Sequence, residues 1–207
     1  MTKARARLPG VILAGGRATR MGGGDKGLLP LAGARLIDRV IARLSAQCAP
    51  LAINANGDPA RLADLGLPVL PDGLPDHPGP LAGVLAGLDW AAGLGLHAIV
   101  TVAADTPFFP ADLVDRLVQA AGPSGLALAS SPDESGTVQR HPTFGLWPTS
   151  LRDDLRAALE GGLRKIVRWT DGHGAGTALF SSAPFDPFFN VNTPADLAAA
   201  EALAAHA

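Results

Sequence analysis

The residues best suited to chemistry stand in one glycine-rich stretch near the start of the chain. It reads Val11-Ile-Leu-Ala-Gly-Gly-Arg-Ala-Thr-Arg-Met-Gly-Gly-Gly-Asp-Lys26. Glycine lets the backbone turn through positive φ and brings main-chain N–H groups within reach of an anion. Arg17, Arg20 and Lys26 add fixed positive charge, and Asp25 is the one acid among them. Glycines and cations in this order predict a loop that binds phosphates.

An excess of positive over negative charge is concentrated at the start of the chain. The first thirty residues carry a formal charge of +5, whereas the other 177 residues carry −7. The net charge of −2 argues against a nucleic-acid partner, because binding to a phosphate backbone normally requires a basic surface. A surface loop with solvated charges is the plain alternative for the glycine-rich stretch.

Two common phosphate-binding motifs do not fit. A P-loop needs Lys directly after Gly and a hydroxyl residue after Lys, but an acid and a glycine flank Lys26. Gly22, Gly24 and Gly27 match the spacing of a dinucleotide fingerprint, yet they begin eight residues after Ala14, where the first strand should end. The stretch therefore indicates a different class of phosphate site.

Length and composition limit the number of domains and the cellular compartment. A chain of 207 residues, 47% of them hydrophobic, can bury one core, so we expect a single domain over residues 1–207 with residues 1–7 as a flexible tail. Cys48 is the only cysteine, which excludes an internal disulfide and favours a reducing compartment. Since no apolar run reaches roughly 18 residues and the start lacks a signal-peptide core, we expect a cytoplasmic protein without a membrane segment.

The elements that must position these residues alternate between strand and helix. Strands are predicted at residues 11–13, 51–53, 69–70, 98–103, 126–129, 143–147 and 177–180. Helices are predicted at residues 36–44, 60–65, 81–92, 151–159 and 163–169, with two more opening at Pro110 and Thr193. This alternation predicts an α/β protein with a Rossmann-like three-layer fold and a largely parallel central sheet. In such sheets ligands bind beyond the carboxyl ends of the strands, where Gly15, Asn54, Asp72 and Asp105 are expected to lie.

The chain also resembles a known family. The order Leu-Ala-Gly-Gly, Arg-Met-Gly, Asp-Lys is similar to the signature of nucleotidyltransferases that build molybdenum cofactors, most closely the guanylyltransferases. Further matching motifs follow in the same order: Ala52-Ile-Asn-Ala-Asn, Leu70-Pro-Asp, Gly79-Pro-Leu-Ala-Gly83, Asp105-Thr-Pro107, His141-Pro-Thr143 and Asn190-Val-Asn-Thr-Pro194. Relatives that use CTP carry Leu-Ala-Ala-Gly in place of Leu13-Ala-Gly-Gly16, so the second glycine favours the guanine enzymes.

The resemblance implies transfer of GMP from GTP to the molybdenum-molybdopterin cofactor, with release of pyrophosphate. Attack of one phosphate on another brings two anions together, so the site must neutralise charge, a task that suits Lys26 and Arg20. Mg²⁺ is the expected cofactor, and by resemblance Asp105 holds it and shares in catalysis. The residues that the resemblance implies for GTP binding are Leu13, Ala14, Gly15, Gly16, Lys26, Asn54, Asp72 and Asp105. GTP and the molybdopterin cofactor are the expected ligands, and molybdenum-insertion proteins and molybdoenzyme chaperones are candidate partners.

For several of these residues a purely structural role is the alternative to a functional one. Asp105 could cap the turn at Thr106-Pro107, and Asp72 could be an ordinary Pro-Asp-Gly turn residue. Asn190 and Asn192 flank Val191 in a strand-like stretch, where both amides could face the pterin or could instead satisfy loop backbone.

Further acceptor candidates are weaker. His141 could face the acceptor or be an ordinary hydrogen-bonded loop histidine. Arg164 and Lys165 could hold an acceptor phosphate or lie on a solvated helix face.

Three other functions are rivals. The first is a cytidylyltransferase of the same cofactor, or a sugar-phosphate nucleotidyltransferase on a related scaffold, and product analysis with each nucleotide would separate these. An NAD-dependent oxidoreductase is disfavoured because no glycine fingerprint directly follows the first strand. A non-catalytic nucleotide-binding module would use the loop but would give Asp105 no metal to hold.

Overall fold

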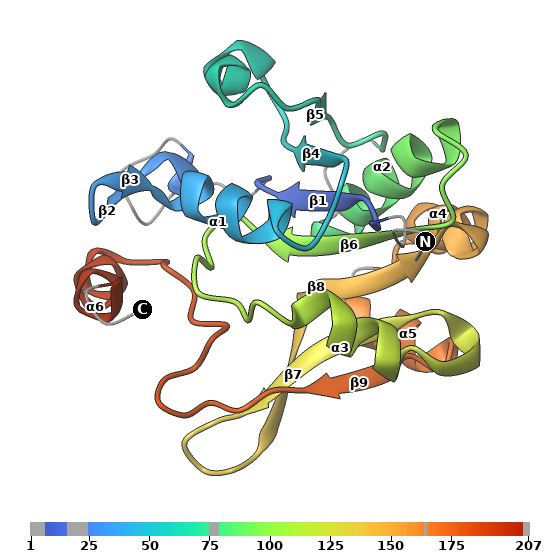
Figure 1. Cartoon of the computed structure of the whole chain (residues 1–207). Helices are drawn as coiled ribbons and strands as arrows, with labels where there is room; N and C mark the ends of the chain where they lie inside the picture. Colours follow the sequence, from blue (N-terminus) through green and yellow to red (C-terminus); the bar gives the residue numbers. More distant parts are fainter. Residues whose placement is uncertain (1–6, 16–24, 75–78, 164, 205–207) are drawn as a thin grey trace, which may run out of the picture.

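The computed structural model describes residues 7–15, 25–74, 79–163 and 165–204. Gly16, Arg17, Arg20 and Arg164 lie outside these ranges, as does most of the tail expected over residues 1–7. Within the described residues, seven strands form one sheet in the order β5-β4-β1-β6-β8-β7-β9 (Figure 1).

The sheet is largely parallel, as the alternation of elements predicts. Its strands are β1 (Gly10–Leu13), β4 (Leu51–Asn54), β5 (Val69–Leu70), β6 (Ala98–Ala103), β7 (Ala127–Pro132), β8 (Val138–Pro148) and β9 (Gly176–Leu179). Strand β8 runs antiparallel to both of its neighbours, β6 and β7, and the other pairs are parallel. A separate small hairpin pairs β2 (Pro30–Leu31) with β3 (Ala34–Arg35).

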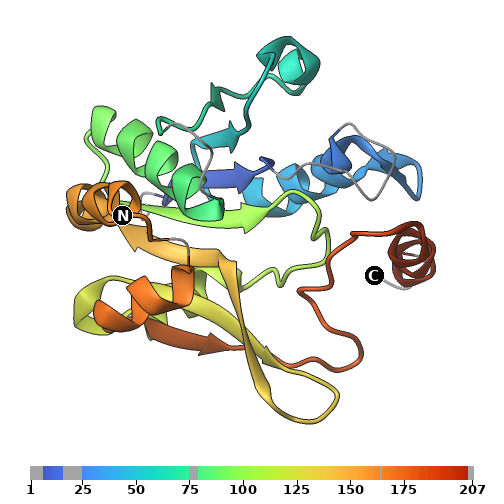
Figure 2. The same cartoon turned by 180° about the vertical axis from the view of Figure 1, so that it is seen from behind.

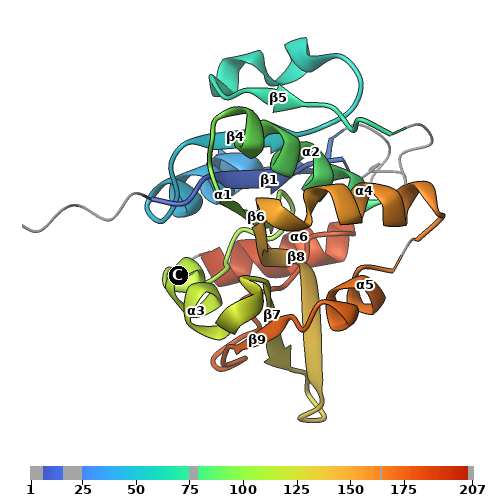
Figure 3. The same ribbon diagram turned by 90° about the vertical axis from the view of Figure 1, so that its right-hand side faces the viewer.

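Helices cover both faces of the sheet and complete three layers. The α-helices are α1 (Leu36–Ser45), α2 (Pro80–Gly93), α3 (Leu113–Ala120), α4 (Arg152–Glu160), α5 (Ile166–Gly172) and α6 (Pro194–Ala204). Short 3-10 turns are η2 (Lys26–Leu28), η3 (Pro59–Leu65), η4 (Gly122–Ser124) and η5 (Thr149–Leu151). Helices α1 and α3 lie on one face, and α2, α4 and α5 lie on the other (Figures 2 and 3). Throughout the described ranges, no helix is both long and apolar enough to cross a membrane.

The spacing of apolar residues explains how the layers pack. Helix α1 buries Leu36, Ile37, Val40 and Leu44, which recur on one face at helical spacing. Helix α2 instead buries most of its length and lies unusually close to β1. A Cβ added at Gly87 would stand 2.9 Å from Val11 Cγ2 and 2.8 Å from Ile99 Cδ1, so this glycine permits the close approach.

Helix α6 stands apart from the three layers, beside the β2–β3 hairpin (Figure 1). Leu31 of β2 shares a small buried cluster with Val191 and Ala200. The backbone N–H of Ala32, at the hairpin turn, donates to Glu201 Oε1 at 2.9 Å. The C-terminal helix is thus fixed to the segment that directly follows the glycine-rich stretch.

Some element boundaries differ from expectation. The helix expected to open at Pro110 begins at Leu113, because residues 110–113 form a turn in which the Leu113 N–H donates to the Pro110 carbonyl at 3.2 Å. The helix expected over residues 163–169 is α5, which begins at Ile166. Residues 190–192 form a loop rather than a strand, so their side chains are placed by tertiary contacts and not by strand alternation.

Candidate active site

A pocket opens at the carboxyl ends of β1, β4 and β6. Its volume is about 280 Å³, near the lower end of the roughly 300–1,000 Å³ usual for small-molecule sites. Its lining residues are Leu13, Gly15, Asn54, Asn56, Asp72, Gly79, Pro80, Ala103, Asp105, Thr143 and Asn190. The expectation that the polar residues after these strands meet at one place is confirmed.

The topology explains why the pocket lies there. From β1 the chain runs outward to β4 and β5, and then crosses back through α2 to β6 on the other side of β1. The direction of winding reverses between β1 and β6, which is where open α/β sheets bind ligands. Gly15 follows β1 and Asp105 follows β6, so both stand at this reversal.

One wall of the pocket is a network of amides around a carboxylate. The Asn54 side chain is only 4% exposed, and its Nδ2 donates to Asp72 Oδ1 at 2.8 Å and to the Leu70 carbonyl at 3.0 Å. Asn56 Nδ2 donates to Asp72 Oδ2 at 2.8 Å, and Asn56 Oδ1 accepts from the Asp72 backbone N–H at 2.8 Å. Asp72 therefore orders this wall and is more than a turn residue.

Asn56 is a pocket residue that the sequence reasoning missed. It is the second asparagine of Ala52-Ile-Asn-Ala-Asn, two positions after Asn54 and beyond the end of β4. A second amide at that position was the signal that could have found it.

The buried amide of Asn54 has room because helix α2 carries a glycine beside it. A Cβ added at Gly83 would stand 2.2 Å from Asn54 Oδ1 and 2.9 Å from Leu13 Cδ2. This contact gives a physical reason for Gly83 in the Gly79-Pro-Leu-Ala-Gly83 motif. Gly83 therefore makes room for the polar wall of the pocket and, together with Gly87, for the close packing of α2 on β1.

Lys26 and Asp105 meet at the edge of this pocket. Lys26 Nζ lies 3.8 Å from Asp105 Oδ2, and the two side chains are 18% and 24% exposed. Gly27 lets the Lys26 segment approach the end of β6, since a Cβ there would stand 3.3 Å from that of Ala104. Burial raises the pKa of Asp105 above its usual value, and the nearby Lys26 ammonium opposes this shift.

The setting of Asp105 fits a magnesium ligand. Mg²⁺ is commonly held by one or two carboxylates together with substrate phosphates and water. Asp105 supplies one carboxylate at the pocket edge, where Thr106 Oγ1 lies 3.3 Å from its Oδ1. Across the described ranges, no three His, Cys, Asp or Glu side chains gather closely enough to hold a metal by themselves.

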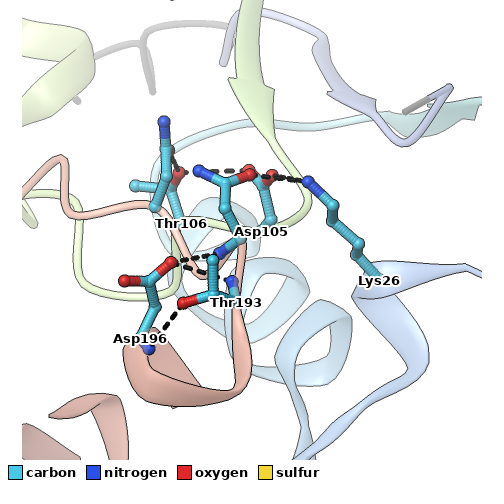
Figure 4. Close-up of polar contacts among 7 residues, drawn as sticks. Lys26, Asp105, Thr106, Thr193 and Asp196 are labelled. Carbon is cyan, nitrogen blue, oxygen red and sulfur yellow. Dashed lines mark hydrogen bonds and ion pairs between the residues drawn. The ribbon is translucent and has the colours of Figure 1, made fainter. Parts of the chain in front are cut away.

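The C-terminal segment reaches the same place (Figure 4). Asn192 Oδ1 accepts a hydrogen bond from Lys26 Nζ at 2.6 Å. Asn190 Oδ1 accepts from the hydroxyl of Thr106, which is fully buried, and the Val191 backbone N–H donates to the Asp105 carbonyl at 2.9 Å. The structure thus brings both asparagines to the Lys26–Asp105 pair.

A second group missed by sequence reasoning holds the end of the glycine-rich stretch. Arg61 of η3 forms an ion pair with Asp25, the residue before Lys26, and its Nη2 donates to the Asn56 carbonyl at 2.7 Å. The guanidinium therefore joins the loop end to the polar wall of the pocket.

Two weaker acceptor candidates lie away from the pocket lining. His141 Nε2 is 2.7 Å from Ser131 Oγ, and the ring stacks on Phe188 with centroids 4.2 Å apart. These contacts favour a structural, hydrogen-bonded histidine over a residue that faces the acceptor. Burial lowers the pKa of His141 below its usual value. Lys165 is the exposed residue just before α5.

Comparison with known proteins agrees with this geometry. Residues 10–175 match the MobA-like NTP transferase domain. The molybdenum cofactor guanylyltransferase of Bradyrhizobium sp. is 52% identical over 203 residues, which covers 96% of this chain and 93% of the relative. The protein of the same name from Mesorhizobium japonicum is 48% identical over 206 residues, covering 96% and 97%.

Solved structures share the fold. Molybdopterin-guanine dinucleotide biosynthesis protein A from Archaeoglobus fulgidus superposes with a TM-score of 0.71 at 23% identity, covering 97% of this chain and all of that one. A 2-C-methyl-D-erythritol 4-phosphate cytidylyltransferase from Thermus thermophilus gives 0.68 at 22% identity, covering 94% and 98%. With the family match over most of its length and relatives at about half identity over nearly all of it, the chain belongs to the molybdenum cofactor guanylyltransferase family and is a nucleotidyltransferase.

Proposed function

We propose that this protein transfers GMP from GTP to the terminal phosphate of the molybdenum-molybdopterin cofactor and releases pyrophosphate. One observation carries the proposal: a lysine and a carboxylate from distant parts of the chain stand 3.8 Å apart at the edge of a pocket whose wall is built of amides. A transferase that joins two phosphates needs both a cation and a metal-binding acid at one place. The names of the homologous proteins support guanine as the base.

In this proposal the pocket holds the nucleoside. Asn54, Asn56 and Asp72 present hydrogen-bond donors and acceptors from its wall, and Gly15 lines it where β1 ends. Leu13, Ala14 and Gly16 belong to the same strand end and its continuation, and we assign their backbone to the nucleotide as well. Arg20, outside the described residues, is assigned to the phosphates on its charge and its place in the glycine-rich sequence.

Lys26 and Asp105 act on the reacting phosphates. Lys26 places a positive charge where the anionic nucleophile meets the α-phosphate and where the departing pyrophosphate gains negative charge. Asp105 would hold Mg²⁺, which would supply further positive charge against the nucleotide phosphates. The pairing of Lys26 with Asp105 keeps both groups at the same edge before substrate arrives.

The direct test is a comparison of nucleotides. Purified protein is incubated with Mg²⁺, molybdenum-loaded molybdopterin and either GTP, CTP or ATP, and both pyrophosphate and the dinucleotide product are measured. We expect product with GTP and strongly reduced rates with CTP and ATP. Equal or faster turnover with CTP would instead identify a cytidylyltransferase, and nucleotide binding without pyrophosphate release would identify a non-catalytic module.

A further inference from the structure

The matched family domain ends at residue 175, yet residues beyond it contact the lysine of the candidate active site. We propose that Asn192 is a positioning residue that holds the Lys26 ammonium beside Asp105, and that Asp196 fixes Asn192 for this task from the start of helix α6. The inference rests on the proposed function for the part that Lys26 plays in transfer. Under this proposal helix α6 contributes to the active site by holding the residue that positions Lys26.

The first step is the contact itself. Lys26 Nζ is held at two points, by Asn192 Oδ1 at 2.6 Å and by Asp105 Oδ2 at 3.8 Å. A lysine side chain has many rotamers, and a charge-assisted hydrogen bond restricts them more strongly than a neutral one. Because an amide oxygen carries only a partial charge, it can fix the ammonium without cancelling the charge that phosphates need.

The second step is the way in which Asn192 is held. Asp196 Oδ2 accepts hydrogen bonds from the backbone N–H groups of Asn192 at 2.9 Å and Thr193 at 2.8 Å, and Thr193 Oγ1 accepts from the Asp196 N–H at 3.1 Å (Figure 4). This is the reciprocal pattern of a capping box. These hydrogen bonds lower the pKa of Asp196, so its carboxylate stays ionised and fixes the backbone of Asn192.

The third step is that both ends of the Lys26–Asn192 bond belong to one packed unit. Lys26 leads into the β2–β3 hairpin, and Ala200 of the helix after Asn192 shares a buried cluster with Leu31 of that hairpin and with Val191. The distance between the lysine and the amide is therefore set by apolar packing away from the pocket. The bond joins residues 166 positions apart in sequence.

A direct contact between Asn192 and the acceptor is the competing explanation, and a double-mutant cycle separates the two. If Asn192 acts through Lys26, Asn192→Ala should lower kcat by roughly tenfold, the equivalent of one hydrogen bond to a charged group, and leave the acceptor KM nearly unchanged. In a Lys26→Ala background the same substitution should have almost no further effect. An equal loss in both backgrounds, or a loss confined to the acceptor KM, would overturn the proposal.

A second measurement does not depend on transfer activity. The chain has three lysines, Lys3, Lys26 and Lys165, so acetylation by an N-hydroxysuccinimide ester can be followed at each by peptide mass spectrometry, with exposed Lys165 as the internal reference. Relative to Lys165, Lys26 should react several-fold faster in Asn192→Ala and in Asp196→Ala. Unchanged reactivity of Lys26 in both variants would refute the positioning role.

Matched variants complete the design. Asp115, an exposed first-turn acid of α3, serves as the control for Asp196, and Asp115→Ala should leave the reactivity of Lys26 unchanged. Asn192→Asp keeps an oxygen acceptor and should keep Lys26 protected, whereas exposure of Lys26 in this variant would count against the inference. If the parent protein released no pyrophosphate, the proposed function would fail while the acetylation pattern still decided the positioning role.

Discussion

Gly83→Ala should damage the nucleotide pocket through a single methyl group. The new Cβ would stand 2.2 Å from Asn54 Oδ1 and 2.8 Å from Asn54 Cγ, so the buried amide must leave its place. Asn54 would then lose its hydrogen bonds to the Leu70 carbonyl and to the Asp72 carboxylate. One neutral bond and one bond to a charged group together amount to about 2.5 to 4 kcal/mol.

Alanine also favours a helix over glycine by about 1 kcal/mol, which offsets part of this loss. The free energy of unfolding should therefore fall by about 1.5 to 3 kcal/mol, and the melting temperature by roughly 3 to 12 °C for a chain of this size. Because the displaced amide lines the pocket, the KM for GTP should rise in the fraction that stays folded.

The assay is urea denaturation combined with steady-state kinetics for both Gly83→Ala and Gly93→Ala. Gly93 ends the same helix and has open space around the position of a Cβ, so its substitution should leave stability unchanged or raise it by up to about 1 kcal/mol. If Gly83→Ala were as stable as Gly93→Ala and bound GTP as well as the parent, the proposed dependence of the Asn54 wall on Gly83 would be wrong.

The remaining predictions concern charge. Lys26→Ala should fold normally and slow turnover by on the order of 10²-fold, as loss of one preorganised charged group does, whereas Lys165→Ala should stay within a few-fold of the parent. Asp105→Asn should lose its activation by Mg²⁺ in a metal titration, yet should be at least as stable to urea at neutral pH, because burial disfavours the ionised carboxyl that it replaces. His141 has a pKa below its usual 6.5 in the folded protein, so its contribution to stability is complete above pH 6.5 and is lost as the pH falls through the lowered value. Stability curves of the parent and His141→Gln should diverge in that acidic window, and parallel curves would show that His141 does not carry the effect.

Much of the site could be predicted because it follows from strand order. Asn54 is the last residue of β4, and Asp72 and Asp105 come two residues after β5 and β6, which are short apolar runs with parallel neighbours. Parallel strands place their carboxyl ends on one edge of a sheet, so residues far apart in sequence meet there without any knowledge of side-chain contacts. Strand order was therefore sufficient to place Asn54 and Asp72 in the wall of the pocket, but not Asn56.

The contacts around Lys26 could not be predicted in this way. They require the β2–β3 hairpin, whose strands are two residues each and carry no alternation long enough to detect. They also require α6 to dock on that hairpin, and nothing in the pattern of residues 194–204 specifies which surface the helix will cover. The Arg61–Asp25 ion pair could not be predicted either, since it joins η3 to the residue before η2, and no sequence pattern relates these two elements.

Contacts in the wall of the pocket and contacts around Lys26 should respond differently to substitution. The wall of the pocket belongs to the buried sheet and helix α2, so changes there should alter stability and nucleotide binding together, as argued for Gly83. The Lys26–Asn192 bond lies at partly exposed side chains between the sheet and the C-terminal unit, where a substitution removes one polar contact and leaves the core intact. Substitutions at Lys26 and Asn192 should therefore change turnover without changing stability. Substitutions at Asn54 should change both, because the amide of Asn54 is buried within the three layers.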